Sequence, residues 1–212
     1  MNKYYFVVLA CFCILASQCK KADTTPQSPT DIASASPYIN ATIDSGSISL
    51  APVNQYQAVL NNQTLGALAP DSSTETYNYS ISSLTSLNNY LVAIYVGDEE
   101  FAGTGKPADS AFYGYFTRGR KKFSFGILAT NSYHIAFNWI DNSGNNWQSN
   151  PPAGTGSGNQ SGSSFVVDTF IQTTQNGNTA IKMQAHFNCK IYYNGNSKNV
   201  TNGTFVVYFE NK

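Results

Sequence analysis

The chain has 212 residues, a length typical of one globular domain with or without a short extension. It carries 12 basic and 12 acidic residues. The formal net charge is therefore zero, which argues against a nucleic-acid partner, because phosphate binding needs an excess of positive charge. Charged residues make up only 11% of the chain and aromatic residues 14%, a balance that excludes charge-driven disorder and favours an all-β protein outside the cytoplasm.

The first 18 residues, MNKYYFVVLACFCILASQ, have the pattern of a secretory signal peptide. Lys3 supplies the positive charge at the start, and the segment from Tyr4 to Ala16 contains no charged residue. This apolar run is shorter than the roughly 20 residues that a transmembrane helix needs, but it suits the apolar region of a signal peptide. We therefore expect residues 1–18 to be a lipoprotein signal peptide.

The residues Ala16-Ser17-Gln18-Cys19 resemble a bacterial lipobox, in which the cysteine becomes the lipidated N-terminus. The resemblance implies lipidation at Cys19 and a membrane partner through that lipid. A rival match ends at Cys11, but cleavage there would leave the apolar residues Phe12 to Leu15 on the mature protein. Ordinary secretion without a lipid is the alternative.

The cysteine count excludes a disulfide framework in the mature protein. Cys11 and Cys13 leave with the signal peptide, and a lipid on Cys19 leaves Cys189 alone. Cys189 lies in a run of alternating apolar residues, so we expect a small buried side chain rather than a reactive nucleophile.

The mature chain divides into a tether and one domain. Residues 19–38 comprise the anchor cysteine and a segment rich in Ser, Thr, Pro and Ala, which predicts a flexible tether. A single domain is expected over residues 39–212. Within it, residues 149–164 are rich in Gly and Ser, which predicts a flexible loop.

From Ile39 onwards the chain is a series of short segments with β-type alternation. Residues 90–96 are almost continuously apolar and predict a central strand buried on both faces. The clearest hairpin joins 111–118 to 122–128, and only 84–89 could hold a helical turn. The expected strands are 39–44, 47–50, 55–60, 74–83, 90–96, 111–118, 122–128, 133–141, 165–173, 179–193 and 201–210.

This pattern predicts an all-β fold. An antiparallel β-sandwich of about ten strands is the expected architecture, because polar and aromatic residues mix at the outward positions. A closed or partly open β-barrel is the alternative.

The C-terminal segment around Ala185–Cys189 and Asn199–Phe205, together with the Cys19-Lys20-Lys21 junction, resembles small β-rich lipoproteins of the Bacteroidota. The resemblance covers the signal region and the last part of the chain. It implies a β-rich lipoprotein of the cell surface or periplasm, and it brings no catalytic residues.

Few residues suggest a metal site. His134 and His186 both lie opposite the apolar stripe of their expected strands, so they could approach each other if those strands paired. However, the chain has no HxH, HExxH or CxxC motif, and a protein metal site normally needs three or four ligands. We therefore predict no metal and no cofactor.

Catalytic groups are equally sparse. The acidic cluster Asp98-Glu99-Glu100 is expected to be a solvated turn, and residues 141–146 are expected to form a hairpin turn, with calcium binding as the alternative. No serine lies in a G-x-S-x-G motif. The basic run 118–122 predicts a solvated hairpin tip, with contact to acidic glycans as the alternative. The sequence therefore predicts a non-enzymatic protein.

Aromatic and amide residues give the most useful functional signal. Rings surrounded by Asn, Gln and Asp suit stacking against sugars, although Trp139 also fits the core face of its strand. The predicted ligand-binding residues are Trp147, Trp139, Asp141, Asn145 and Tyr192.

Taken together, these patterns predict a lipoprotein of the cell envelope, anchored in the outer membrane and facing either the periplasm or the outside. We expect it to bind a glycan or an envelope protein. A structural or accessory subunit of a surface assembly is the alternative, and a hydrolase is the less favoured one.

Overall fold

The structure is a computed structural model that describes residues 29–53, 56–69, 72–84, 91–123, 134–151 and 158–212. The predicted signal peptide and Cys19 lie outside these residues. The strands of the described part are β1 (Tyr38–Ile43), β2 (Gly46–Leu50), β3 (Tyr56–Ala69), β4 (Ser72–Ser83), β5 (Leu91–Ala102), β6 (Gly119–Phe123), β7 (His134–Ile140), β8 (Asn146–Gln148), β9 (Ser164–Gln175), β10 (Asn178–Tyr193) and β11 (Asn196–Asn211).

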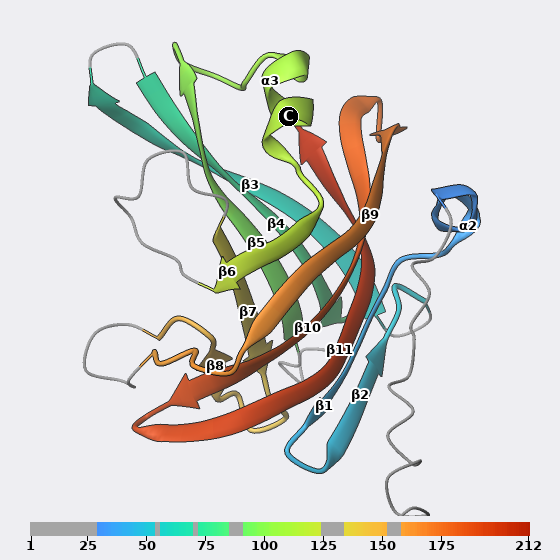
Figure 1. Ribbon diagram of the computed structural model, residues 1–212, viewed down its shortest axis with the longest axis vertical. Helices are drawn as coiled ribbons and strands as arrows, with labels where there is room; N and C mark the ends of the chain where they lie inside the picture. The colour runs from blue at the N-terminus through green and yellow to red at the C-terminus, as the bar shows by residue number, and fades with distance from the viewer. Residues whose placement is uncertain (1–28, 54–55, 70–71, 85–90, 124–133, 152–157) are drawn as a thin grey trace, which may run out of the picture.

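These strands form one continuous sheet in the order β2-β1-β11-β10-β9-β6-β7-β5-β4-β3, with β8 paired to both β10 and β7. The ladders are antiparallel apart from a short parallel contact between β6 and β7. The sheet curls into a half-barrel (Figure 1). The predicted all-β class is thus confirmed, whereas the sandwich is not, because the strands join in a single ladder rather than two stacked sheets.

The edge strand β3 approaches the C-terminal end of β11, an interior strand of the sheet, without pairing with it. Asn62 in β3 donates a side-chain hydrogen bond to the carbonyl of Glu210 in β11 at 2.9 Å. Lys212 donates from Nζ to the carbonyl of Leu60 in β3 at 2.5 Å. Side chains rather than strand pairing therefore hold β3 against the end of β11.

Alternation along the strands sends one set of side chains into the half-barrel. In β10 the buried inward positions include Ile181, Met183 and Phe187, each at most 2% exposed. The prediction for β5 is confirmed, because Ala93 and Ile94 point to opposite faces and both are fully buried. The centre is aromatic: the Phe187 ring lies 5.1 Å from that of Phe137, measured between centroids.

Two tight turns follow from the sequence. Asn176-Gly177 joins β9 to β10, and Asn194-Gly195 joins β10 to β11. All four residues have positive φ angles between 47° and 83°. This is the conformation of the two central residues in an Asn-Gly hairpin turn. Glycine adopts positive φ angles readily because it has no Cβ atom, and asparagine tolerates them better than most other residues. The turns fix the register of the three longest consecutive strands.

One helix occupies a segment that the sequence analysis assigned to a strand. α3 (Asp109–Tyr115) closes one end of the half-barrel, the end opposite β8 (Figure 1). The predicted strand 111–118, and with it the hairpin to 122–128, is therefore wrong. Phe112 and Phe116 are one helical turn apart and pack together at 5.1 Å between ring centroids. Residues four apart lie on the same face of a helix and also on the same face of a strand. The spacing of Phe112 and Phe116 therefore did not distinguish a helix from a strand.

A second helix falls in the expected tether. α2 (Pro29–Ser34) packs against the outside of β9 and β10. Ile32 is fully buried, and Lys182 donates from Nζ to the carbonyl of Ala33 at 2.9 Å. The folded part thus starts near residue 29 rather than 39. No helix in the described ranges is long and apolar enough to cross a membrane.

Gly203 offers a test of the packing. It pairs with Phe187 across β10 and β11, and a Cβ at this position would lie 2.6 Å from that ring. We expect Gly203→Ala to lower the free energy of unfolding by about 1–3 kcal/mol, the usual cost of overpacking a core. Denaturant unfolding measures the change.

The matched control is Gly46→Ala. The nearest atom to a Cβ at Gly46 is a backbone oxygen at 3.7 Å, an ordinary contact. Equal stability losses in the two variants would contradict the described packing of Phe187 on Gly203.

Candidate functional site

A tight turn lies between β7 and β8, at the end of the half-barrel away from α3. Asp141 accepts hydrogen bonds at Oδ1 from the backbone N–H groups of Ser143 and Asn145, at 2.9 and 3.0 Å. Its Oδ2 accepts from the Asn145 side chain and from Nε1 of Trp147, both at 3.0 Å. Both carboxylate oxygens are thus committed to holding the turn.

Burial on its own would raise the pKa of this carboxyl. The hydrogen bonds from Asn145, Trp147 and Ser143 outweigh that effect, so the pKa of Asp141 lies below its usual range. The group is therefore ionised at neutral pH and acts as the acceptor for the turn.

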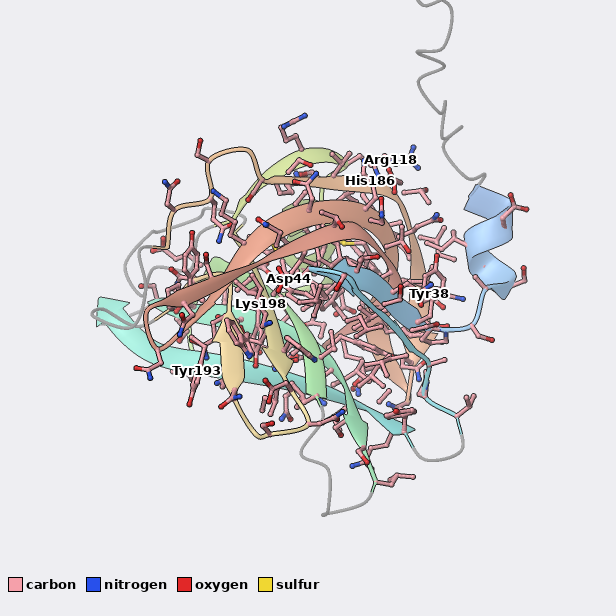
Figure 2. The ribbon with its side chains drawn as sticks, turned by 90° about the horizontal axis from the view of Figure 1, so that it is seen from below. Tyr38, Asp44, Arg118, His186, Tyr193 and Lys198 are labelled. Carbon is pink, nitrogen blue, oxygen red and sulfur yellow. The ribbon has the colours of Figure 1, made fainter. Side chains whose placement is uncertain are left out.

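The two tryptophans of this turn stack on the inner side of the sheet. Trp139 and Trp147 pair across β7 and β8, with ring centroids 6.3 Å apart. Trp147 is only 7% exposed, and the Nζ of Lys198 lies 4.8 Å from its ring centroid. Lys198 also forms an ion pair with Asp44 at 3.1 Å. Figure 2 shows Asp44 and Lys198 side by side, with Tyr193 at the margin of the molecule.

Tyr192 lies on the other side of the sheet from the tryptophans. It pairs with Gln148 of β8, and its hydroxyl donates to the carbonyl of Asn159 at 2.6 Å. Gln160 continues this contact, because its Nε2 donates to the carbonyls of Ser149 and Lys190 at 2.6 and 2.7 Å. Residues 158–163 of the expected flexible loop are therefore held against β10, while 152–157 lie outside the described residues.

The structure thus brings the five predicted ligand-binding residues into one region but gives each a structural contact. Asp141 and Asn145 build the turn, Trp139 and Trp147 stack beneath it, and Tyr192 supports the segment around Asn159. Their role in binding remains a prediction.

The outer face of the same strands carries a pocket that the sequence analysis did not identify. We call it the amide pocket; it has a volume of about 200 Å³ and is lined by Tyr95, Ala136, Asn138, Gln148 and Asn150. The register places these residues together, since Tyr95 pairs with Ala136 and Asn138 pairs with Gln148. The available sequence signal was the outward face of β7, where Ala136 and Asn138 alternate with the inward Ile135 and Phe137.

The described lining residues of the amide pocket are uncharged at neutral pH. Burial raises the pKa of the Tyr95 phenol, and hydrogen bonds with Asn78 and Asn138 offset only part of this effect. The remaining polar lining groups are amides, which both donate and accept hydrogen bonds. This chemistry suits a neutral ligand rich in hydroxyl or amide groups.

The predicted solvated turn at 98–100 is wrong at Glu99, because β5 continues through this segment. Glu99 is 3% exposed, and the Tyr77 hydroxyl donates to its Oε2 at 2.6 Å. Glu75, its partner in register on β4, is 1% exposed. Burial raises the pKa of Glu99, the Tyr77 hydrogen bond lowers it, and the charge of Glu75 raises it again. The two carboxyl groups therefore form a buried pair across β4 and β5.

The two histidines do not come together through strand pairing. β9 and β6 separate β10 from β7 in the sheet order, so His186 and His134 lie on strands that are not neighbours. His186 contacts Asp168 instead, at 2.7 Å between Nδ1 and Oδ1. The side chain of His134 lies outside the described residues. Among the side chains that are described, no three His, Cys, Asp or Glu lie close enough to hold a metal ion.

The other candidates have structural positions. Most of the basic run lies in β6 rather than at a hairpin tip, and Lys121 of this strand donates to Thr117. Arg118 immediately precedes β6, and its guanidinium carbon lies 5.9 Å from the centroid of the Phe170 ring. Cys189 is 4% exposed, and burial raises the pKa of its thiol, which confirms the predicted small buried side chain.

Comparison with known proteins finds no matching family model, no matching curated protein and no matching solved structure. The resemblance to lipoproteins of the Bacteroidota therefore stays a prediction. The functional argument depends on the geometry of this chain alone.

Asp141 provides a test of the turn. We expect Asp141→Ala to lower the free energy of unfolding by about 1–3 kcal/mol, because Trp147 Nε1 and the turn N–H groups lose their acceptor. Because the folded-state pKa is lowered, the carboxylate stabilises the fold above the ordinary value of 3.8 and less so as the pH falls through the folded-state pKa.

The stability gap between the wild type and Asp141→Asn should therefore narrow as the pH falls below 3.8. Denaturant unfolding at a series of pH values measures it, with Asn142→Ala in the same turn as the control. A gap that stays constant through the acid range would show that Asp141 is not the charged acceptor described here.

Proposed function

We propose that the chain is a lipid-anchored envelope protein without catalytic activity, and that it binds a neutral sugar residue of a glycan in the amide pocket. The observation that carries this proposal is the described lining of the pocket, which comprises a tyrosine, an alanine and three amide side chains and, among the described residues, no charged group.

A sugar residue matches the amide pocket in chemistry and size. Amides can donate to and accept from the same hydroxyl group, while the Tyr95 ring offers an apolar face to the C–H groups of a sugar. The volume of about 200 Å³ lies below the roughly 300–1,000 Å³ of pockets that enclose a drug-sized ligand. We therefore expect one residue of a longer glycan to enter the pocket.

Two features favour binding over catalysis. Among the residues that the structure describes, the lining of the amide pocket contains no carboxylate, histidine or cysteine, which general acid–base and nucleophilic reactions commonly use. The buried pair Glu75 and Glu99 lies inside the half-barrel, away from the outer face that carries the pocket. A glycosidase needs two carboxyl groups beside the scissile bond, so a hydrolase is the less favoured function.

The envelope location rests on the N-terminal sequence. Residues 1–18 have signal-peptide character, and Cys19 follows a lipobox-like sequence. We propose that the lipid anchors the protein in the outer membrane, facing the periplasm or the outside; secretion without a lipid is the alternative. In both cases the domain would meet envelope polysaccharides.

A second candidate function has one observation in its favour. β2 lies at the end of the strand order, and its sequence, GSISL, contains no charge and no proline. Edge strands usually carry charged residues or proline, which block pairing with the strands of other chains. An accessory subunit could therefore dock by adding a strand to β2.

The glycan proposal predicts that Asn138→Ala weakens binding to neutral polysaccharides by about tenfold, the usual effect of losing one or two hydrogen bonds. The measurement is binding of the intact protein to a panel of neutral polysaccharides. The control is Asn142→Ala, an exposed amide in the adjoining turn that does not line the pocket. Absence of binding to every polysaccharide of the panel, or equal affinity of Asn138→Ala and Asn142→Ala, would contradict the proposal.

The anchor proposal predicts that Cys19→Ala moves the protein from the membrane fraction to the soluble fraction of cells. Cys189→Ala is the matched control, since it removes a buried cysteine of the domain and should leave membrane association unchanged. Continued membrane association of Cys19→Ala would exclude lipidation at this residue.

A further inference from the structure

A second, larger hollow lies on the outer face of the sheet, between the ends of β10, β11 and β1. We call it the bulge groove; its volume is about 680 Å³. Its lining combines polar and apolar surface and comprises Asp44, Ser161, Gly162, Ser163, Asn188, Cys189, Lys190, Asn199, Val200, Thr201 and Asn202.

The groove exists because three neighbouring strands lose their register at the same level. The β10–β11 ladder passes from the pair Phe187–Gly203 to the pair Cys189–Val200, so this ladder skips Thr201 and Asn202, although Thr201 still pairs with Thr42 of β1. The β1–β11 ladder also shifts there. Asn202 has a φ angle of 52°, which turns the chain outward. Bulges of this kind are frequent beside binding sites because they redirect side chains and leave backbone groups off the ladder.

The rim of the groove is well ordered. The Gln160 side chain accepts from the backbone N–H of Lys190 at 3.0 Å and donates to the Lys190 carbonyl at 2.7 Å. The Ser163 hydroxyl donates to the same Gln160 side chain at 2.7 Å. The Lys190 backbone is therefore held by Gln160, and Lys190 also lines the groove.

The charge of the groove is positive in balance. Asp44 is neutralised by Lys198 at 3.1 Å and accepts from the backbone N–H of Asn199 at 3.0 Å. The pKa of Asp44 is lowered, first by that backbone hydrogen bond, with burial opposing it and Lys198 lowering it further. Within the described part of the chain, Lys190 makes no ion pair. Lys190 thus brings an ammonium group to a groove lined by amides and hydroxyls, a setting suited to a carboxylate.

The bulge groove and the amide pocket share one outer surface. Gln148 of the amide pocket pairs with Tyr192 on β10, two residues along the strand from Lys190. The Ser149 carbonyl, between two lining residues of the amide pocket, accepts from the same Gln160 that holds Lys190. One ligand chain could therefore cross from the first site to the second.

We propose that the bulge groove binds an acidic sugar residue, with its carboxylate on Lys190, and that this residue belongs to the same glycan whose neutral residue enters the amide pocket. The link between the two sites depends on the proposed function, but the groove itself does not. The ligand class is thus an oligosaccharide that carries a carboxylate, such as a uronate-containing chain.

The test compares acidic probes with their neutral methyl esters. We would measure binding of the intact protein to tetragalacturonate and its methyl ester, and to sialyllactose and its methyl ester. The acidic member of at least one pair should bind about tenfold more tightly, and its binding should weaken as salt rises from about 0.05 to about 0.5 M. Lys190→Gln should abolish that advantage, whereas Arg120→Gln, which removes an exposed charge outside the groove, should retain it.

The outcomes separate this inference from the proposed function. Equal affinity within both pairs, no binding of either acidic probe, or an acid preference that survives Lys190→Gln would overturn the acidic-sugar site. If sodium acetate at matched ionic strength displaces the acidic probe fully, the groove binds a simple carboxylate and the inference also falls. If Lys190→Gln removes the acid preference while Asn138→Ala changes nothing, the groove stands and the amide-pocket proposal falls.

Discussion

The packing of the Phe187 ring on Gly203 is the contact on which the rest of the structure depends. The ring fills the centre of the half-barrel, with the rings of Phe137, Phe165 and Phe205 around it at centroid distances of 5.1 to 6.2 Å. It can do so only because the residue opposite has no side chain. The ladder then loses register immediately beyond this pair. The same contact that completes the core therefore opens the groove on the outer face.

Because side chains alternate between the two faces of each strand, the inner and outer faces of the sheet differ in composition. The inner face holds the large rings and the enclosed Glu75–Glu99 pair, while the outer face carries amides and hydroxyls on the same strands. At the β7–β8 turn the two roles meet, since Trp147 packs inward while its neighbour Gln148 faces outward. A rigid aromatic support beneath an adaptable polar surface is a common arrangement for binding proteins.

The sequence predicted the C-terminal strands well, because β9, β10 and β11 combine long alternation with Asn-Gly turns that local chemistry determines. It failed where the outcome depends on distant contacts. α3 was read as a strand since aromatic residues favour strands locally, while its helical form depends on packing against β4 and β11. The choice between a sandwich and a half-barrel is set by the strand order, which no single segment encodes. The predicted site residues Trp139 and Trp147 lie on β7 and β8, the strands that also carry Asn138 and Gln148, but the tryptophans directed the prediction to the inward face of these strands.

The docking of α2 on the outside of β9 and β10 limits how far the domain could travel from its anchor. A tether that ended at residue 38 would let it range widely. With Ile32 buried and Ala33 held by Lys182, only residues 20–28 would separate a lipid on Cys19 from the folded body. Fully extended, these residues reach about 30 Å, at about 3.3 Å each. With so short a linker, the domain would contact only polymers that lie within about one domain diameter of the bilayer. The length of the linker would therefore restrict which ligands the protein can bind.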